Sequence, residues 1–162
     1  MLITSYQRLV KEGKEILPDL MDTFLTASNF AGTAFETAGC AAVHALSYPL
    51  GAKYHVPHGE SNYVVFTGVL KNYMEIKQDG EIANMNEFLA KLLHCDVKVV
   101  YEELENLLNS VLQKKPLHEY GVTEEDAEDF AESVMKTQGR LMANNFVVLD
   151  YDRVLKIYKE LL

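Results

Sequence analysis

Residues 44–62 read HALSYPLGAKYHVPHGESN, and their glycines and prolines decide how this part of the chain folds. Because proline restricts its own backbone and that of the residue before it, Pro49 and Pro57 predict short helical pieces joined by fixed turns. The turn at Pro57 places His58 at the start of the following helix. His44 lies fourteen residues earlier, so the chain can fold back and aim both imidazoles at one point.

The two histidines are candidate metal ligands. His44 lies in the apolar, small-residue segment 41–46, where an imidazole is either a hydrogen-bonded core residue or a ligand. Neutral imidazoles suit divalent iron or zinc, and a catalytic site needs about three protein ligands and an open position. Two histidines are too few, so a further ligand must come from elsewhere. His94 and His118 stand among ordinary helix and loop residues, where a solvated or capping role is expected.

Apolar residues recur at helical spacing along almost the whole chain, which predicts an all-α fold. The segment 19–38 carries apolar and small residues with little charge, and this pattern predicts a core helix buried on several sides. No GxGxxG turn and no alternating strand and helix pattern appear, so a complete Rossmann unit is absent. The other expected helices cover residues 3–10, 63–74 and 152–161, with an extended start as the alternative for 63–74. Three more begin near Asn84, Asp96 and Thr123, which are candidate N-caps, and Asp126 pairs with Thr123 there.

Composition excludes several classes of partner. The 162 residues are 48% hydrophobic and 24% charged, as expected of one globular domain. The formal net charge of −9 disfavours binding to nucleic acid or to an anionic membrane. No apolar stretch approaches the ~20 residues of a membrane span, and the N-terminus lacks a signal peptide, so a cytoplasmic location is expected. Cys40 and Cys95 have no metal-binding spacing and are expected to be reduced thiols.

The run from His44 to Asn62 resembles the metal-binding signature of the iron-containing alcohol dehydrogenases. The preceding segments 31–35 and 38–39 match the helix that leads into that signature. The sequence of residues 47–60 is most similar to that of the 4-hydroxybutyrate dehydrogenase branch. The resemblance implies that residues 1–162 form a single metal-binding domain, the family's all-helical C-terminal domain with its dehydroquinate synthase-like fold.

The resemblance implies that His44 and His58 are two of four ligands to a divalent metal, iron or alternatively zinc. The other two family ligands lie in an upstream Asp-x-x-x-His motif, which is not found before His44. The N-terminal nucleotide-binding domain, which would bind NAD, is also missing. The expectation is therefore an incomplete enzyme: an isolated domain, a truncated gene product or half of a split enzyme.

The resemblance also implies roles for neighbouring residues. Tyr48 stands where the family often carries a second histidine that relays the alcohol proton, although a phenol with a pKa of ~10 stores protons poorly at neutral pH. Phe35 matches a position that lines the substrate pocket, with a core aromatic as the alternative. Lys53 and His55 are candidates to bind a substrate carboxylate, whereas a solvated loop lysine is the alternative for Lys53.

The implied reaction is transfer of hydride between a small alcohol and NAD, with 4-hydroxybutyrate and succinate semialdehyde as the expected pair. The fragment alone is expected to be inactive, and its expected partners are the missing N-terminal domain and further copies in a homo-oligomer. A stand-alone helical protein-interaction module is the alternative, and an apolar patch near Phe35, Tyr48 and Leu50 would favour it. A helical metal sensor would require a complete ligand set in this chain.

Overall fold

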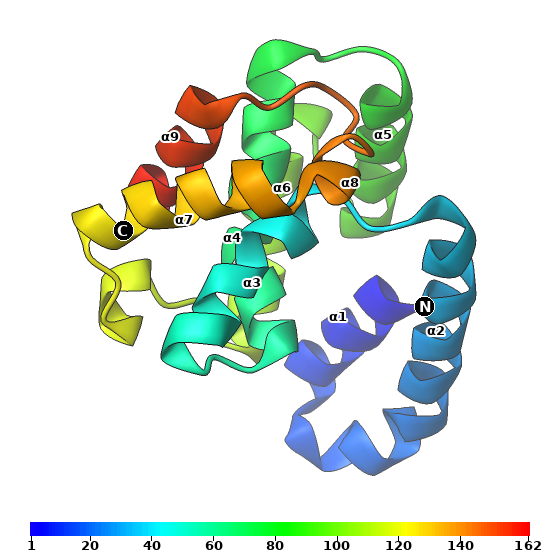
Figure 1. The fold of residues 1–162 in the computed structure, drawn as a ribbon. Coiled ribbons are helices and arrows are strands. Elements are labelled where there is room, and N and C mark those ends of the chain that lie inside the picture. Colours follow the sequence, from blue (N-terminus) through cyan, green and yellow to red (C-terminus); the bar gives the residue numbers. More distant parts are fainter. The chain divides into compact units, whose positions relative to one another are not determined.

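The computed structural model describes residues 1–162, and its regular structure is entirely helical. This confirms the all-α prediction. The chain forms two compact units, each built from two separate stretches of sequence. Residues 1–38 and 79–113 form the first unit, and residues 39–78 and 114–162 form the second (Figure 1). The sequence crosses between the units three times, so each unit is described by itself.

The two units contain nine α-helices and three short 3-10 helices, which are labelled η. The first unit contains α1 (Leu2–Glu12), η1 (Lys14–Ile16), α2 (Leu17–Ala38), α5 (Glu81–Leu93), η2 (Val97–Val99) and α6 (Val100–Val111). The second unit contains α3 (Ala42–Tyr54), α4 (His58–Ile76), η3 (Leu117–Tyr120), α7 (Glu124–Thr137), α8 (Gly139–Met142) and α9 (Tyr151–Leu161).

Side-chain caps are present at the starts of η2, α7 and α9. Thr123 and Asp126 form a capping box at the start of α7, as predicted. The Asp96 side chain accepts a hydrogen bond from the Lys98 backbone at the start of η2. The prediction that Asn84 caps a helix is wrong, because α5 has already begun at Glu81. Residue 80 is a glycine at φ 74°, and it makes the turn into α5 that was assigned to Asn84.

The prediction that α2 is a core helix is wrong. In the first unit only one side of α2 is covered, and its buried residues are Leu20 and Ala27. The side chains of Leu25, Phe30 and Phe35 are 64%, 62% and 56% exposed. Low charge and small side chains allow close packing, but they do not supply a neighbour. Its neighbours along the chain, α1 and η1, are short and leave much of its apolar surface uncovered.

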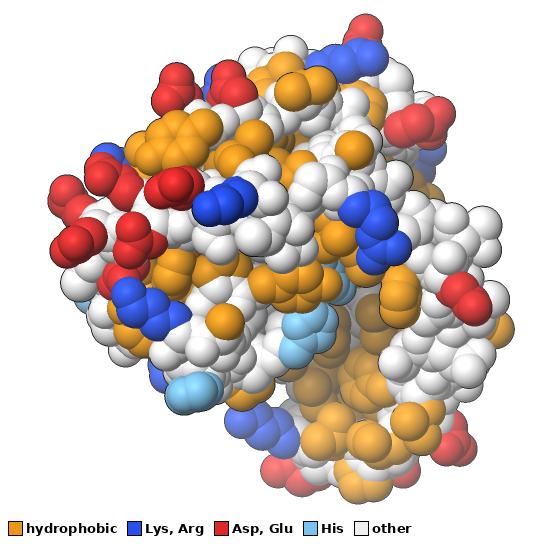
Figure 2. Space-filling view, in the orientation of Figure 1, with side chains coloured by type: hydrophobic (Ala, Val, Ile, Leu, Met, Phe, Trp, Pro, Cys, Tyr) orange, Lys and Arg blue, Asp and Glu red, His pale blue; other side chains and the backbone are white.

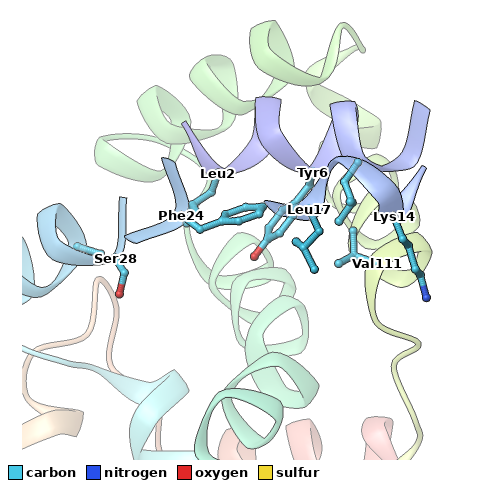
Figure 3. Close-up of a pocket in the computed structure, with 9 residues that line it drawn as sticks. Leu2, Tyr6, Lys14, Leu17, Phe24, Ser28 and Val111 are labelled. Carbon is cyan, nitrogen blue, oxygen red and sulfur yellow. The ribbon is translucent and has the colours of Figure 1, made fainter. Parts of the chain in front are cut away.

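The first unit contains an apolar cavity of about 670 Å³ between α1, α2 and the end of α6. Figure 3 shows the side chains of Tyr6 and Phe24 together in its wall, and their ring centroids lie 5.5 Å apart. Most of the lining is aliphatic or aromatic, and Lys14 supplies the one charged side chain. The cavity is therefore lined by residues of the first unit alone.

The core of the second unit lies where α3, α4, α7 and α9 pack together. Tyr158 on α9 is fully buried, and its hydroxyl donates a 2.8 Å hydrogen bond to the backbone carbonyl of Leu46 on α3. Its ring packs edge-on against Phe130 on α7, with centroids 5.7 Å apart. Helix α3 continues through Pro49, where it lacks one backbone N–H donor. These contacts fix α3, which carries His44.

Acidic side chains gather over α7 on the face shown in Figure 2. The first turn of α7 contains Glu124, Glu125 and Asp126, where the helix dipole favours negative charge. None of the helices combines the length and the apolar character needed to cross a lipid bilayer.

The buried Tyr158 gives a direct test of the second unit's core. We expect Tyr158→Ala to lower the free energy of unfolding by about 3–5 kcal/mol, as for other buried aromatic rings. Tyr158→Phe keeps the ring and loses one hydrogen bond, so we expect a loss of about 1 kcal/mol. Urea denaturation measures both values. Tyr151→Phe at an exposed position is the control, and an equal loss in all three variants would contradict this account.

Candidate metal centre

The structure brings the imidazoles of His44 and His58 together. His44 lies in the first turn of α3, and His58 is the first residue of α4. Their ring centroids are 5.3 Å apart with an interplanar angle of 50°. The ring of His44 is half-buried and that of His58 is exposed. Two helices that follow one another in sequence therefore present their histidines to one shared space.

Three residues between α3 and α4 make the turn that produces this pairing. His55 ends α3 in the left-handed conformation at φ 55°. The side chain of Val56 is buried, and Pro57 caps α4 at φ −54°. The Ser61 hydroxyl donates to the Val56 carbonyl at 3.1 Å, which ties the turn to the first turns of α4. The turn predicted from Pro57 is present, and it fixes the backbone next to His58.

Burial is the main electrostatic influence on His44. It lowers the pKa of His44, and the nearby charge of His58 lowers it further. Both effects favour the neutral imidazole, which is the form that binds a metal ion. The chain contains no group of three or more His, Cys, Asp or Glu side chains arranged to hold a metal ion. The two imidazoles thus fit part of a ligand set.

Asn62 is a neighbour of this pair that sequence reasoning did not identify. Its side-chain amide donates to His58 Nε2 at 3.1 Å, one helical turn after His58 on α4. A neutral His58 that accepts this bond carries its proton on Nδ1. The carbonyl oxygen of the same amide is buried without a partner. The signal in the sequence was the spacing of four residues, which places two side chains on one helix face.

Of the other predicted site residues, Tyr48 lies beside the histidine pair. The Tyr48 ring stacks beside that of His58, with centroids 6.3 Å apart and an interplanar angle of 26°. Phe35 lies on α2 in the first unit and is exposed. Leu50 is fully buried in the second unit, so it cannot contribute to an exposed apolar patch.

Lys53 and His55 lie at the end of α3, between His44 and His58 in the sequence. The Lys53 ammonium forms an ion pair with Asp126, the third residue of α7. The His55 side chain is exposed. Sequence reasoning identified Asp126 as a capping residue and missed this second role. No local pattern reveals the contact, because 73 residues separate its partners.

The whole chain, residues 1–162, matches the family model described as Fe-containing alcohol dehydrogenase family, C-terminal. The chain belongs to this family. It is 43% identical over 161 residues to 4-hydroxybutyrate dehydrogenase of Clostridium kluyveri. It is also 36% identical over 124 residues to long-chain-alcohol dehydrogenase 1 of Geobacillus thermodenitrificans. The first match covers 99% of this chain and 43% of the relative, and the second covers 73% and 31%.

Solved structures of the family share the fold. An archaeal halo-thermophilic alcohol dehydrogenase from a Red Sea brine pool superposes on 76% of this chain and 33% of its own, with a TM-score of 0.69 and 23% identity. A 1,3-propanediol oxidoreductase covers 74% of this chain and 32% of its own, with a TM-score of 0.55 and 22% identity. The helical arrangement is therefore that of Fe-type alcohol dehydrogenases.

The environment of Asp126 predicts how the fold responds to acid. Hydrogen bonds from Lys53 and then from Tyr54 hold the pKa of Asp126 well below its usual range. A carboxyl whose pKa is lower in the folded state stabilises the fold above its unfolded pKa of ~3.9, and the contribution is lost as pH falls below that value. We expect stability to fall below about pH 4, and less steeply in Asp126→Asn. Urea denaturation across the acid range measures this slope.

The control for the acid response is Glu12→Gln in the first unit. Glu12 is an exposed carboxylate whose pKa is lowered by a hydrogen bond from Arg8 on the same helix. Exposed pairs of this kind contribute little to stability. The acid slope of the control should therefore match that of the unaltered chain. The same slope in Asp126→Asn as in the control would contradict the assignment to Asp126.

Proposed function

We propose that this chain is the metal-binding C-terminal part of an NAD-linked, metal-dependent alcohol dehydrogenase that interconverts 4-hydroxybutyrate and succinate semialdehyde. The observation that carries the proposal is the 5.3 Å separation of the His44 and His58 rings. The Clostridium relative, which is named a 4-hydroxybutyrate dehydrogenase, supports the choice of substrate. The chain spans less than half of that relative, so the proposal concerns a larger enzyme.

His44 and His58 would hold the metal, as two ligands of a set whose other members come from outside this chain. A divalent cation bound there would supply Lewis acidity towards the oxygen of the substrate, and NAD would accept the hydride. Iron is our first choice for the cation and zinc our second, because imidazole suits both. The lowered pKa of His44 favours its neutral, metal-binding form. In His58, Nε2 accepts a hydrogen bond from the Asn62 amide, so this bond would have to break before Nε2 could bind the cation.

Tyr48 would pass the proton of the substrate alcohol towards solvent. Its ring lies beside that of His58 and is 40% exposed, so the phenol borders both the histidine pair and water. A phenol can donate and accept a hydrogen bond, which allows it to relay a proton without storing one. Tyr48 would therefore act through its position between the histidine pair and water, without storing the proton.

We propose that His55 and Lys53 bind the carboxylate of 4-hydroxybutyrate, with His55 now the stronger candidate. His55 is exposed beside the turn that leads to His58. The charge of Lys53 is already neutralised by Asp126, which weakens its attraction for a second carboxylate. The role of Phe35 in contacting the substrate stays a prediction, since Phe35 lies on α2 in the first unit.

The metal proposal predicts weak binding through both histidines. Zn²⁺ added to the chain should shift the ring signals of His44 and His58 in NMR spectra, with low affinity because much of the chelate stabilisation is missing. His44→Ala should weaken binding by more than the roughly 10–100-fold typical of changes in outer-shell partners. His118→Gln, at an exposed histidine, is the matched control and should leave binding unchanged. Unaltered affinity in His44→Ala would remove the proposed site.

The activity proposal predicts that this chain needs a partner. The purified chain with Zn²⁺ or Fe²⁺, NAD and 4-hydroxybutyrate should form no NADH above a protein-free blank. The reason is that NAD binding and the remaining ligands are assigned to sequence outside residues 1–162. NADH formation by the chain alone would contradict that assignment, whereas formation only after an N-terminal half is added would support it.

A helical interaction module is a second candidate, favoured by the exposed apolar side chains of Leu25, Phe30 and Phe35 on α2. Exposed apolar surface of this kind often marks a binding face. The two functions differ in what the histidines do. Loss of a partner's binding in Phe30→Ser, with no effect of His44→Ala, would favour the module over the dehydrogenase.

A further inference from the structure

We propose that Asp126 is a positioning residue for the histidine pair, because its carboxylate holds the turn that joins the two proposed ligands. The inference rests on the proposed metal-binding function of His44 and His58. The start of α7 is far from both histidines in sequence. In this proposal it keeps their rings at a fixed spacing.

The Asp126 carboxylate accepts hydrogen bonds from three residues on two segments. Lys53 and Tyr54, the last two residues of α3, both donate to it, and the Tyr54 hydroxyl lies 2.6 Å from Oδ2. The backbone N–H and the hydroxyl of Thr123 also donate to Oδ2, each at 2.8 Å. The Asp126 side chain is only 7% exposed, so water competes weakly for these bonds. One buried carboxylate thus fastens the end of α3 to the start of α7.

A second hydrogen bond fastens the other side of the same turn. The Tyr120 hydroxyl donates to Glu60 in the first turn of α4 at 2.8 Å. Tyr120 and Asp126 are six residues apart, so one short segment holds both α3 and α4. We call residues 120–126 the bracket segment. It contacts Lys53 and Tyr54, just before the turn of residues 55–57, and Glu60, three residues after that turn.

The bracket segment lies in close contact with the end of α3. Gly121 adopts φ 93°, and a side chain added there would meet the Tyr54 ring at 3.3 Å. The backbone of the segment therefore approaches α3 as closely as glycine allows. Any shift of the bracket segment would move Tyr54, which is four residues before His58.

The ion pair of Lys53 with Asp126 differs in position from the other ion pairs of the second unit. Lys159 and Glu128 join α9 to α7 at 3.2 Å, and Lys156 and Arg153 join α9 to Glu75 on α4. These pairs lie away from the ends of α3 and α4 that flank the turn. Losing one of them should change stability without changing the spacing of the rings. Glu128→Gln on α7 is therefore the matched control for Asp126→Asn.

The test compares these two variants of the full chain with labelled histidine rings. Without metal, Asp126→Asn should weaken the nuclear Overhauser contact between the rings of His44 and His58, and Glu128→Gln should preserve it. With Zn²⁺, Asp126→Asn should lower affinity by about 10-fold, in the range for residues that orient ligands. An unchanged ring contact and affinity in Asp126→Asn would overturn the proposal, as would equal changes in both variants.

Two further variants keep the test decisive. If Asp126→Asn does not fold, Tyr54→Phe removes one bond to the carboxylate and keeps the ring that packs near Phe130. It should move the ring contact in the same direction by a smaller amount. Asp126→Glu restores the charge and should recover part of the ring contact, which a loss of stability alone does not predict. If the unaltered chain binds no Zn²⁺, the proposed function fails, and the metal-free ring contact still decides the role of Asp126.

Discussion

The turn between α3 and α4 is the constraint on which the rest of the candidate site depends. It reverses the chain within three residues, through the left-handed backbone of His55 and the fixed φ of Pro57. Each of these residues limits the backbone locally, and the buried Val56 anchors the turn in the core. The result is that two helices which follow one another in sequence carry their histidines to one place.

The core of the second unit supports this turn from two directions. The Tyr158 hydroxyl donates to the backbone of α3 two residues after His44, while Asp126 and Tyr120 bond the segments on each side of the turn. Polar groups with low exposure make these contacts, and each has a defined partner. Removing one partner of such a pair costs more than the bond contributes, because the other group stays buried and unpaired. Hydrogen bonds outside the site thus fix its geometry.

The features that could be predicted from the sequence are those set by nearby residues. The capping box of Thr123 and Asp126 is a local pattern, and so is the turn around Pro57 that pairs the histidines. The ion pair of Lys53 with Asp126 could not be predicted, because it depends on the packing of α3 against α7. The burial of α2 was predicted wrongly for the same reason. The small, uncharged side chains of α2 would allow close packing. Whether a neighbouring helix covers them depends on the fold. The prediction of a single domain stays a prediction, and the structure describes two compact units.

The uncovered face of α2 has a practical consequence for the chain in solution. Leu25 and Phe30 expose most of their apolar side chains to water, which is unfavourable in proportion to the area exposed. Salts such as sulfate strengthen the tendency of apolar surfaces to leave water. Concentrated protein in such salts should therefore associate through this helix, and dilute, low-salt buffers favour dispersed chains.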